Sequence, residues 1–89
     1  MWVRRRSNGV WFVAYSHDHP PPHVHGQYAE TIVIVDLLAD GAGGWTTAQS
    51  ERRDAVKPIN AKRSDVRRIL DMAAAHAAEL GQLWEDVHG

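Results

Sequence analysis

The chain has 89 residues, ten basic and eleven acidic, and a formal net charge of −1 at pH 7. This length suits one small domain (1–89), and the near-neutral charge excludes a chain that binds nucleic acid as a polycation. There is no cysteine, which excludes disulfides and thiolate metal sites, so any metal would need histidine or carboxylate ligands.

Membrane and export signals are not recognisable in the sequence. No apolar stretch approaches the roughly 18 residues that a transmembrane helix needs. The N-terminal arginines are not followed by the apolar region of a signal peptide. We therefore expect a cytoplasmic protein with no membrane association.

The first half of the chain predicts a small antiparallel sheet. Residues 2–6 and 10–15 flank Ser7-Asn8-Gly9, and Asn-Gly is typical of a two-residue hairpin turn. A third strand is expected from about His23, with a possible interruption at the following glycine, and the β-branched segment 31–37 is the clearest strand. Strands that are apolar on both faces need cover on both sides. One cover would be a helix, and the other a self-dimer or a partner protein.

The second half predicts a loop, a weak strand and a long helix. Residues 39–50 contain a glycine cluster and are expected as a flexible loop, although Trp45-Thr46-Thr47 has strand character. Ser64 is a favourable N-cap, and apolar residues then recur at helical spacing through Trp84. The sequence thus predicts an α+β domain. A small antiparallel sheet, made of the N-terminal hairpin plus one or two further strands, packs against one long C-terminal helix over 64–88.

Four histidines fall within nine residues, in the run His17-Asp18-His19-Pro20-Pro21-Pro22-His23-Val24-His25. Each pair has the form H-x-H, and residues i and i+2 of an extended chain point to the same face. Each pair can therefore aim two imidazoles at one point. The three prolines stiffen the connection between the pairs, so this loop is the candidate functional site.

Three interpretations of the histidines remain open. The first is a metal site in which His17, His19, His23 and His25 bind a divalent transition metal, zinc or nickel. The second is metal-free acid–base chemistry on nucleic acid, with His19, His23 and His25 as catalytic residues. The third is structural, with the rings bonded to backbone carbonyls. Strand alternation would point Asp18 away from the histidines, so it is interpreted as an Asx-turn residue. The alternative is that it orients a histidine after the loop turns.

Other polar and aromatic residues are weaker candidates. Glu30 or Asp36 could supply a carboxylate to a histidine site, although strand-end charges usually reach solvent. His76 is expected at the edge of the helix stripe, and His88 is expected to fray. Trp45, after the glycine loop, is the candidate anchor for a protein partner.

A basic patch around the start of the helix is a candidate nucleic-acid surface. Phosphate contacts would make such binding salt-dependent, whereas a solvated charged face is the simpler interpretation. The residues concerned are Arg4, Arg6, Arg52, Arg53, Arg67 and Arg68.

The histidine motif is similar to a known family signature. Its residues here are Tyr15-Ser16, Asp18-His19, Pro21-Pro22-His23-Val24-His25 and Tyr28-Ala29-Glu30. In this order they resemble the bacterial domain of unknown function family 4160, small single domains that carry a D-H-x-P-P-H-x-H motif and end in a long helix with a late tryptophan. His19, His23 and His25 match the family histidines, whereas His17 and the stretch 39–58 depart from the pattern.

The resemblance implies a functional context but no reaction. Genes of this family often lie beside a second small gene, which implies a toxin-like component of a toxin–antitoxin-type pair with a small antitoxin-like partner. The alternative is a non-enzymatic metal-binding or regulatory protein-interaction module. Whether the protein is an enzyme is left open.

Overall fold

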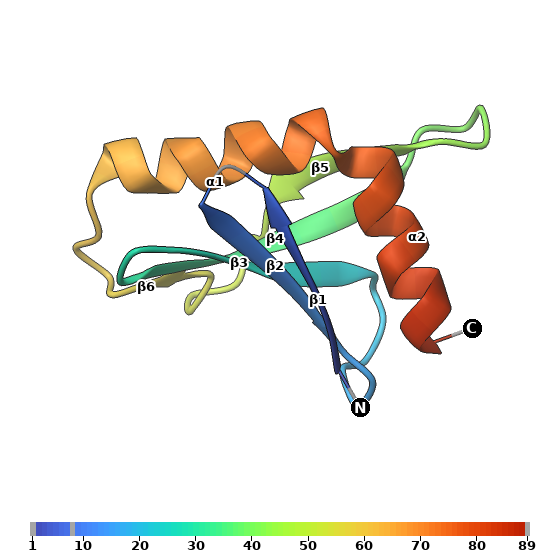
Figure 1. Ribbon diagram of the computed structural model, residues 1–89, viewed down its shortest axis with the longest axis horizontal. Coiled ribbons are helices and arrows are strands. Elements are labelled where there is room, and N and C mark those ends of the chain that lie inside the picture. The colour runs from blue at the N-terminus through green and yellow to red at the C-terminus, as the bar shows by residue number, and fades with distance from the viewer. Residues whose placement is uncertain (1, 8, 89) are drawn as a thin grey trace.

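The protein is an α+β domain in which two helices cover one face of an antiparallel sheet (Figure 1). The computed structural model describes the backbone of residues 2–7 and 9–88 and the side chains of residues 9–88. The strands are β1 (Trp2–Ser7), β2 (Val10–Tyr15), β3 (His23–Tyr28), β4 (Thr31–Ala39), β5 (Trp45–Gln49) and β6 (Val56–Lys57), and the helices are α1 (Arg63–Ala75) and α2 (Ala77–His88). The predicted fold class is confirmed.

The sheet follows the chain order β1-β2-β3-β4-β5, and β6 pairs with β4. The first half of β4 pairs with β6 and its second half with β5, so the sheet is wider than predicted. The hairpin of β1 and β2 is present, and Gly9 has the positive φ of 81° that such turns need. Asn8, the other residue of the predicted turn, lies outside the described residues.

The core lies between the sheet and the helices. Gly26 in the middle of β3 shows how closely they approach, because a Cβ there would lie 2.4 Å from Ile69 Cγ2 and 3.1 Å from Phe12 Cε1. The expected interruption at Gly26 is wrong: β3 is continuous, and its glycine makes room for α1. The core cluster consists of Val10, Phe12, Ala14, Val24, Val33, Val35, Leu37, Ile69, Ala73, Leu80, Leu83 and Trp84.

The predicted single helix over 64–88 is two helices, with α2 turning away from the axis of α1 (Figure 1). The break falls at His76, with φ −117° and ψ 26°. A straight helix of that length would extend about 37 Å at 1.5 Å per residue, whereas the longest dimension of the molecule is 34 Å. The bend keeps Leu80, Leu83 and Trp84 in the core. The N-cap is Lys62 rather than Ser64, since the carbonyl of Lys62 accepts from Val66 N–H.

The segment 39–50 is not one loop, because residues 45–49 form β5. The connection is the short turn 40–44, in which Asp40 Oδ1 accepts hydrogen bonds from the N–H groups of Ala42 (2.7 Å) and Gly44 (2.9 Å). Those two N–H groups lower the pKa of Asp40 below its ordinary value. The strand character of Trp45-Thr46-Thr47 is accounted for by β5, which pairs with β4.

Part of the second sheet face is covered by the chain itself. Ile34 lies in β4 between the residues that pair with β5 and those that pair with β6. Its N–H donates to Ala55 O (2.7 Å), and its carbonyl oxygen accepts from Ser50 N–H (3.0 Å). The chain between β5 and β6 is therefore bonded to β4 at both of its ends. Ile34 is only 6% exposed. A self-dimer or partner is thus not needed to bury Ile34. Neither helix in the described residues is long and apolar enough to span a membrane.

Candidate metal centre

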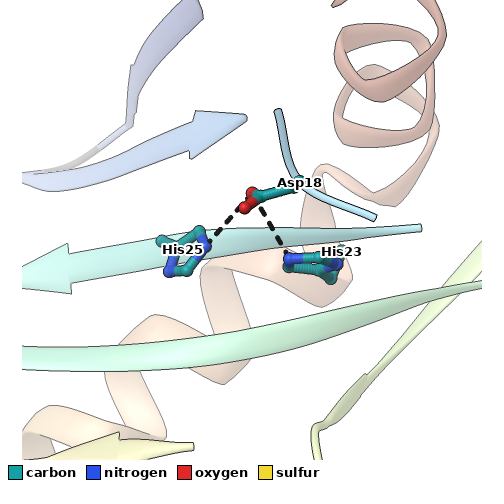
Figure 2. Close-up of side chains that lie close together, drawn as sticks. All are labelled: Asp18, His23 and His25. Atoms are coloured by element: carbon teal, nitrogen blue, oxygen red, sulfur yellow. Dashed lines mark ion pairs between the residues drawn. The ribbon is translucent and has the colours of Figure 1, made fainter. Parts of the chain in front are cut away.

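The candidate site lies where the loop after β2 folds back over β3 (Figure 2). His23 and His25 alternate with Val24 and Gly26, which face the core, so both imidazoles lie on the sheet face opposite α1. The loop turns at once, because Asp18 N–H donates to Tyr15 O (3.1 Å). This turn brings the Asp18 carboxylate to the two imidazoles.

The three side chains converge on a small volume. Asp18 Oδ2 lies 3.3 Å from His23 Nε2 and 3.3 Å from His25 Nε2, and the three ligand atoms lie within 4.8 Å of one another. Bonds of roughly 2.0–2.2 Å to zinc give a tetrahedral ligand–ligand edge of about 3.3–3.6 Å. The separations from Asp18 to the two histidines therefore match neighbouring ligands of one ion.

The tautomer of His23 leaves a lone pair directed at the Asp18 carboxylate. His23 Nδ1 lies 2.9 Å from Pro21 O, and a carbonyl oxygen only accepts, so Nδ1 carries the ring proton. In the neutral ring Nε2 then has a lone pair, and it faces a carboxylate oxygen that also only accepts. A cation between His23 Nε2 and Asp18 Oδ2 would satisfy both atoms. A bond to a backbone carbonyl is also one of the usual ways in which a metal-binding histidine is oriented.

Two atoms of the group are buried without a hydrogen-bond partner. Among the described side chains these are Asp18 Oδ2 and His25 Nε2, which are at ion-pair distance but do not meet hydrogen-bond geometry with each other. The side chains of Asp18 and His23 are 17% and 10% exposed, so water reaches them poorly. Such buried, unsatisfied atoms need an explanation.

The burial of His25 affects its protonation. Burial lowers the pKa of His25 below its ordinary value of 6.5, the charge of Asp18 opposes this shift, and His23 and Arg52 add to it. The neutral imidazole, which is the form that binds metals, is thus favoured in the folded protein.

We expect the metal-free protein to lose stability on acidification below about pH 6.5. The unfolded chain protonates His25 at its ordinary pKa, whereas the folded chain protonates it only at lower pH. Between the two values the unfolded state holds more protons, so the free energy of unfolding falls as the pH falls. Urea unfolding at a series of pH values would measure this slope, and His25→Asn should flatten it. An unchanged slope in His25→Asn would contradict the assignment to His25.

The structure places the predicted histidines in two environments. His23 and His25 join the group, whereas His17 and His19 are exposed and line an adjacent hollow of about 670 Å³ together with Asp36. The structure therefore does not bring all four histidines together. Asp18, for which the sequence favoured the role of a turn residue over that of orienting a histidine, is the third member of the group. The orientation predicted for Asp18 from strand alternation is wrong, because the chain reverses after Tyr15. The sequence signal for Asp18 was its place in the motif.

The remaining candidates lie in other contacts. Glu30 is exposed in the turn after β3. His76 Nδ1 contacts Glu79 Oε1 at 3.2 Å. His88, expected to fray, contacts the Asp18 carbonyl. Trp45, the predicted anchor, is half-buried, and its ring occupies the space that a Cβ at Gly81 would take.

The predicted basic patch is divided among separate contacts. Arg52 Nε pairs with Asp54 at 3.3 Å and lines the hollow beside the site. Arg67 pairs loosely with Asp71, and Arg68 lies over the ring of Tyr28. Arg53 is exposed. The side chains of Arg4 and Arg6 lie outside the described residues.

Fold and site together define a class of small α+β domain in which an H-x-H strand and a folded-back loop assemble an Asp-His-His group. The chain belongs to the family described as Domain of unknown function (DUF4160), whose model matches residues 9–85. The resemblance seen in the motif is thereby confirmed. Comparisons with curated proteins and with solved structures gave no match.

Proposed function

We propose that this protein binds one divalent transition metal ion through Asp18 Oδ2, His23 Nε2 and His25 Nε2. The observation that carries the proposal is the pair of buried, unsatisfied atoms, Asp18 Oδ2 and His25 Nε2. Leaving a buried polar atom unsatisfied costs about 1–3 kcal/mol. One bound cation would remove this cost at both atoms.

The donor set indicates which ions would fit. Two imidazoles and one carboxylate suit zinc, nickel or ferrous iron better than magnesium or calcium, which prefer oxygen ligands. Three protein ligands also leave a coordination position for water or a substrate, as in catalytic zinc sites. The hollow lined by His17, His19 and Arg52 adjoins the group and has room for such a ligand.

Metal content is the direct test. We expect untagged protein, purified at neutral pH and supplied with zinc, to hold one metal ion per chain by native mass spectrometry and elemental analysis. Losing a residue that only hydrogen-bonds a metal ligand typically weakens binding roughly 10–100-fold. His25→Ala and Asp18→Asn each remove a ligand and should weaken metal binding by more than this. His17→Ala and His19→Ala are matched controls from the same loop and should retain the metal. Equal loss in the controls would contradict the three-residue site.

We further propose that the site serves a toxin-like activity on nucleic acid, held in check by a small antitoxin-like partner. The family context suggests this role, and the hollow supports it. His19 and Arg52 line the hollow beside the group. A guanidinium can bind the phosphate of a phosphodiester, and an imidazole can take the proton of the attacking hydroxyl or give one to the leaving oxygen. The alternative is a non-enzymatic metal-binding or regulatory module, or a self-dimer without a partner.

Growth in the absence of the neighbouring gene tests the toxin-like role. We expect induced expression to slow growth and His25→Ala, expressed to the same level, to relieve the effect. Ile59→Ser is a suitable control, because Ile59 is 93% exposed. Normal growth at good expression of the unaltered chain would favour the non-enzymatic module.

A further inference from the structure

We infer that His88 is a positioning residue that holds the Asp18 loop in place for metal binding. The inference rests on the proposed metal site. His88 Nε2 lies 3.1 Å from the carbonyl oxygen of Asp18, across 70 residues of sequence. His88 Nδ1 lies 3.1 Å from the carbonyl oxygen of Trp84, one turn earlier in α2. One imidazole thus connects the end of α2 to the loop that supplies the carboxylate.

A second contact supports the same connection. The ring of His88 stacks on the indole of Trp84, with centroids 3.6 Å apart and planes at 21°. The indole also contacts the ring of His23, at a centroid distance of 5.4 Å. Trp84 is 6% exposed and belongs to the core. The C-terminal part of α2 therefore contacts both the main chain of Asp18, through His88, and the ring of His23, through Trp84.

The contact from His88 matters because Asp18 lies in a loop whose flanking residues are exposed. It lies between β2 and β3, outside the strand pairing, and Ser16, His17, His19 and Pro20 around it are exposed. Its amide is bonded to Tyr15 O, and its carbonyl is the group that His88 contacts. A ligand must be held within roughly 0.5 Å of its binding geometry. Losing the carbonyl contact would leave the loop to be ordered by the metal, and that cost would appear as lower affinity.

The two ring nitrogens can be tested separately. Both face carbonyl oxygens, which only accept, and a neutral imidazole carries one N–H. The bond to Asp18 therefore requires that proton on Nε2. The amide nitrogen of glutamine reaches about as far as Nε2, and that of asparagine about as far as Nδ1. His88→Gln therefore retains a donor for Asp18 O, whereas His88→Asn retains one only for Trp84 O.

Zinc affinity of the folded variants, measured by competition with a chromogenic chelator, tests the inference. We expect His88→Gln to bind zinc like the unaltered chain. His88→Asn should bind zinc roughly 10–100-fold more weakly, which is the usual effect of losing a residue that holds a metal ligand in place. The visible spectrum of the cobalt(II) form should be unchanged in His88→Gln and altered in His88→Asn. Urea unfolding of the metal-free variants would confirm that both are folded at the titration temperature.

The results distinguish a failure of the positioning role of His88 from a failure of the proposed metal site. An unaltered chain that does not bind zinc would overturn the proposed metal site. Zinc binding by the unaltered chain, with equal affinity in His88→Asn, would overturn the positioning role alone. A loss in His88→Gln as large as that in His88→Asn would also overturn it, because the bond to Asp18 would then not carry the effect.

Discussion

Replacing Gly26 with alanine is expected to lower the free energy of unfolding by about 1–3 kcal/mol, the usual range for overpacking a core. The new methyl group would lie 2.4 Å from Ile69 Cγ2, which real Cβ atoms do not tolerate. Cγ2 is bonded to the Cβ of Ile69, and an isoleucine in a helix has one strongly preferred rotamer, so it cannot swing away. Alanine gains roughly 0.5–1 kcal/mol over glycine in a strand, which is too little to offset the clash. Urea unfolding would measure the difference.

A double-mutant cycle identifies the cause of this loss. Ile69→Leu keeps the side-chain volume but removes the branch at Cβ, and with it Cγ2. We expect Gly26→Ala to cost clearly less in the Ile69→Leu background. Gln27→Ala is the control in the same strand, since Gln27 is exposed and surface changes usually stay within about 0.5 kcal/mol. A cost of Gly26→Ala that is unchanged in that background would contradict the assigned clash.

Saturating zinc is expected to raise the free energy of unfolding by about 4 kcal/mol at a thousandfold excess over its dissociation constant. Metal that binds the folded state stabilises it by mass action, and histidines of the unfolded chain reduce the gain only as far as they bind zinc themselves. We assign this expected gain to the proposed site formed by Asp18, His23 and His25. Urea unfolding with and without zinc measures it.

Asp18→Asn should separate metal binding from stability. The amide of asparagine can donate a hydrogen bond to His23 Nε2 or His25 Nε2, which the carboxylate cannot do. The metal-free variant should therefore be at least as stable as the unaltered chain, while its gain from zinc is mostly lost. His19→Ala, from the same loop, should keep the full gain. A full gain from zinc in Asp18→Asn would place the metal elsewhere.

The sequence by itself determined the features that depend on local pattern. The β-branched run became β4, the apolar stripe became the helices, and the H-x-H spacing of His23 and His25 placed both rings on one face. The motif also predicted the family. These features follow from side-chain periodicity and turn chemistry, which act over a few residues and can be read directly from a sequence.

Only the tertiary structure decided which distant residues meet. Asp18 joins the histidines because the loop reverses, and His88 reaches Asp18 because the helix bends at His76 and carries α2 down to the loop. Periodicity predicts the face on which a side chain lies but not where the chain turns back. The bend keeps Leu80, Leu83 and Trp84 in the core, and this packing involves residues far apart in the sequence.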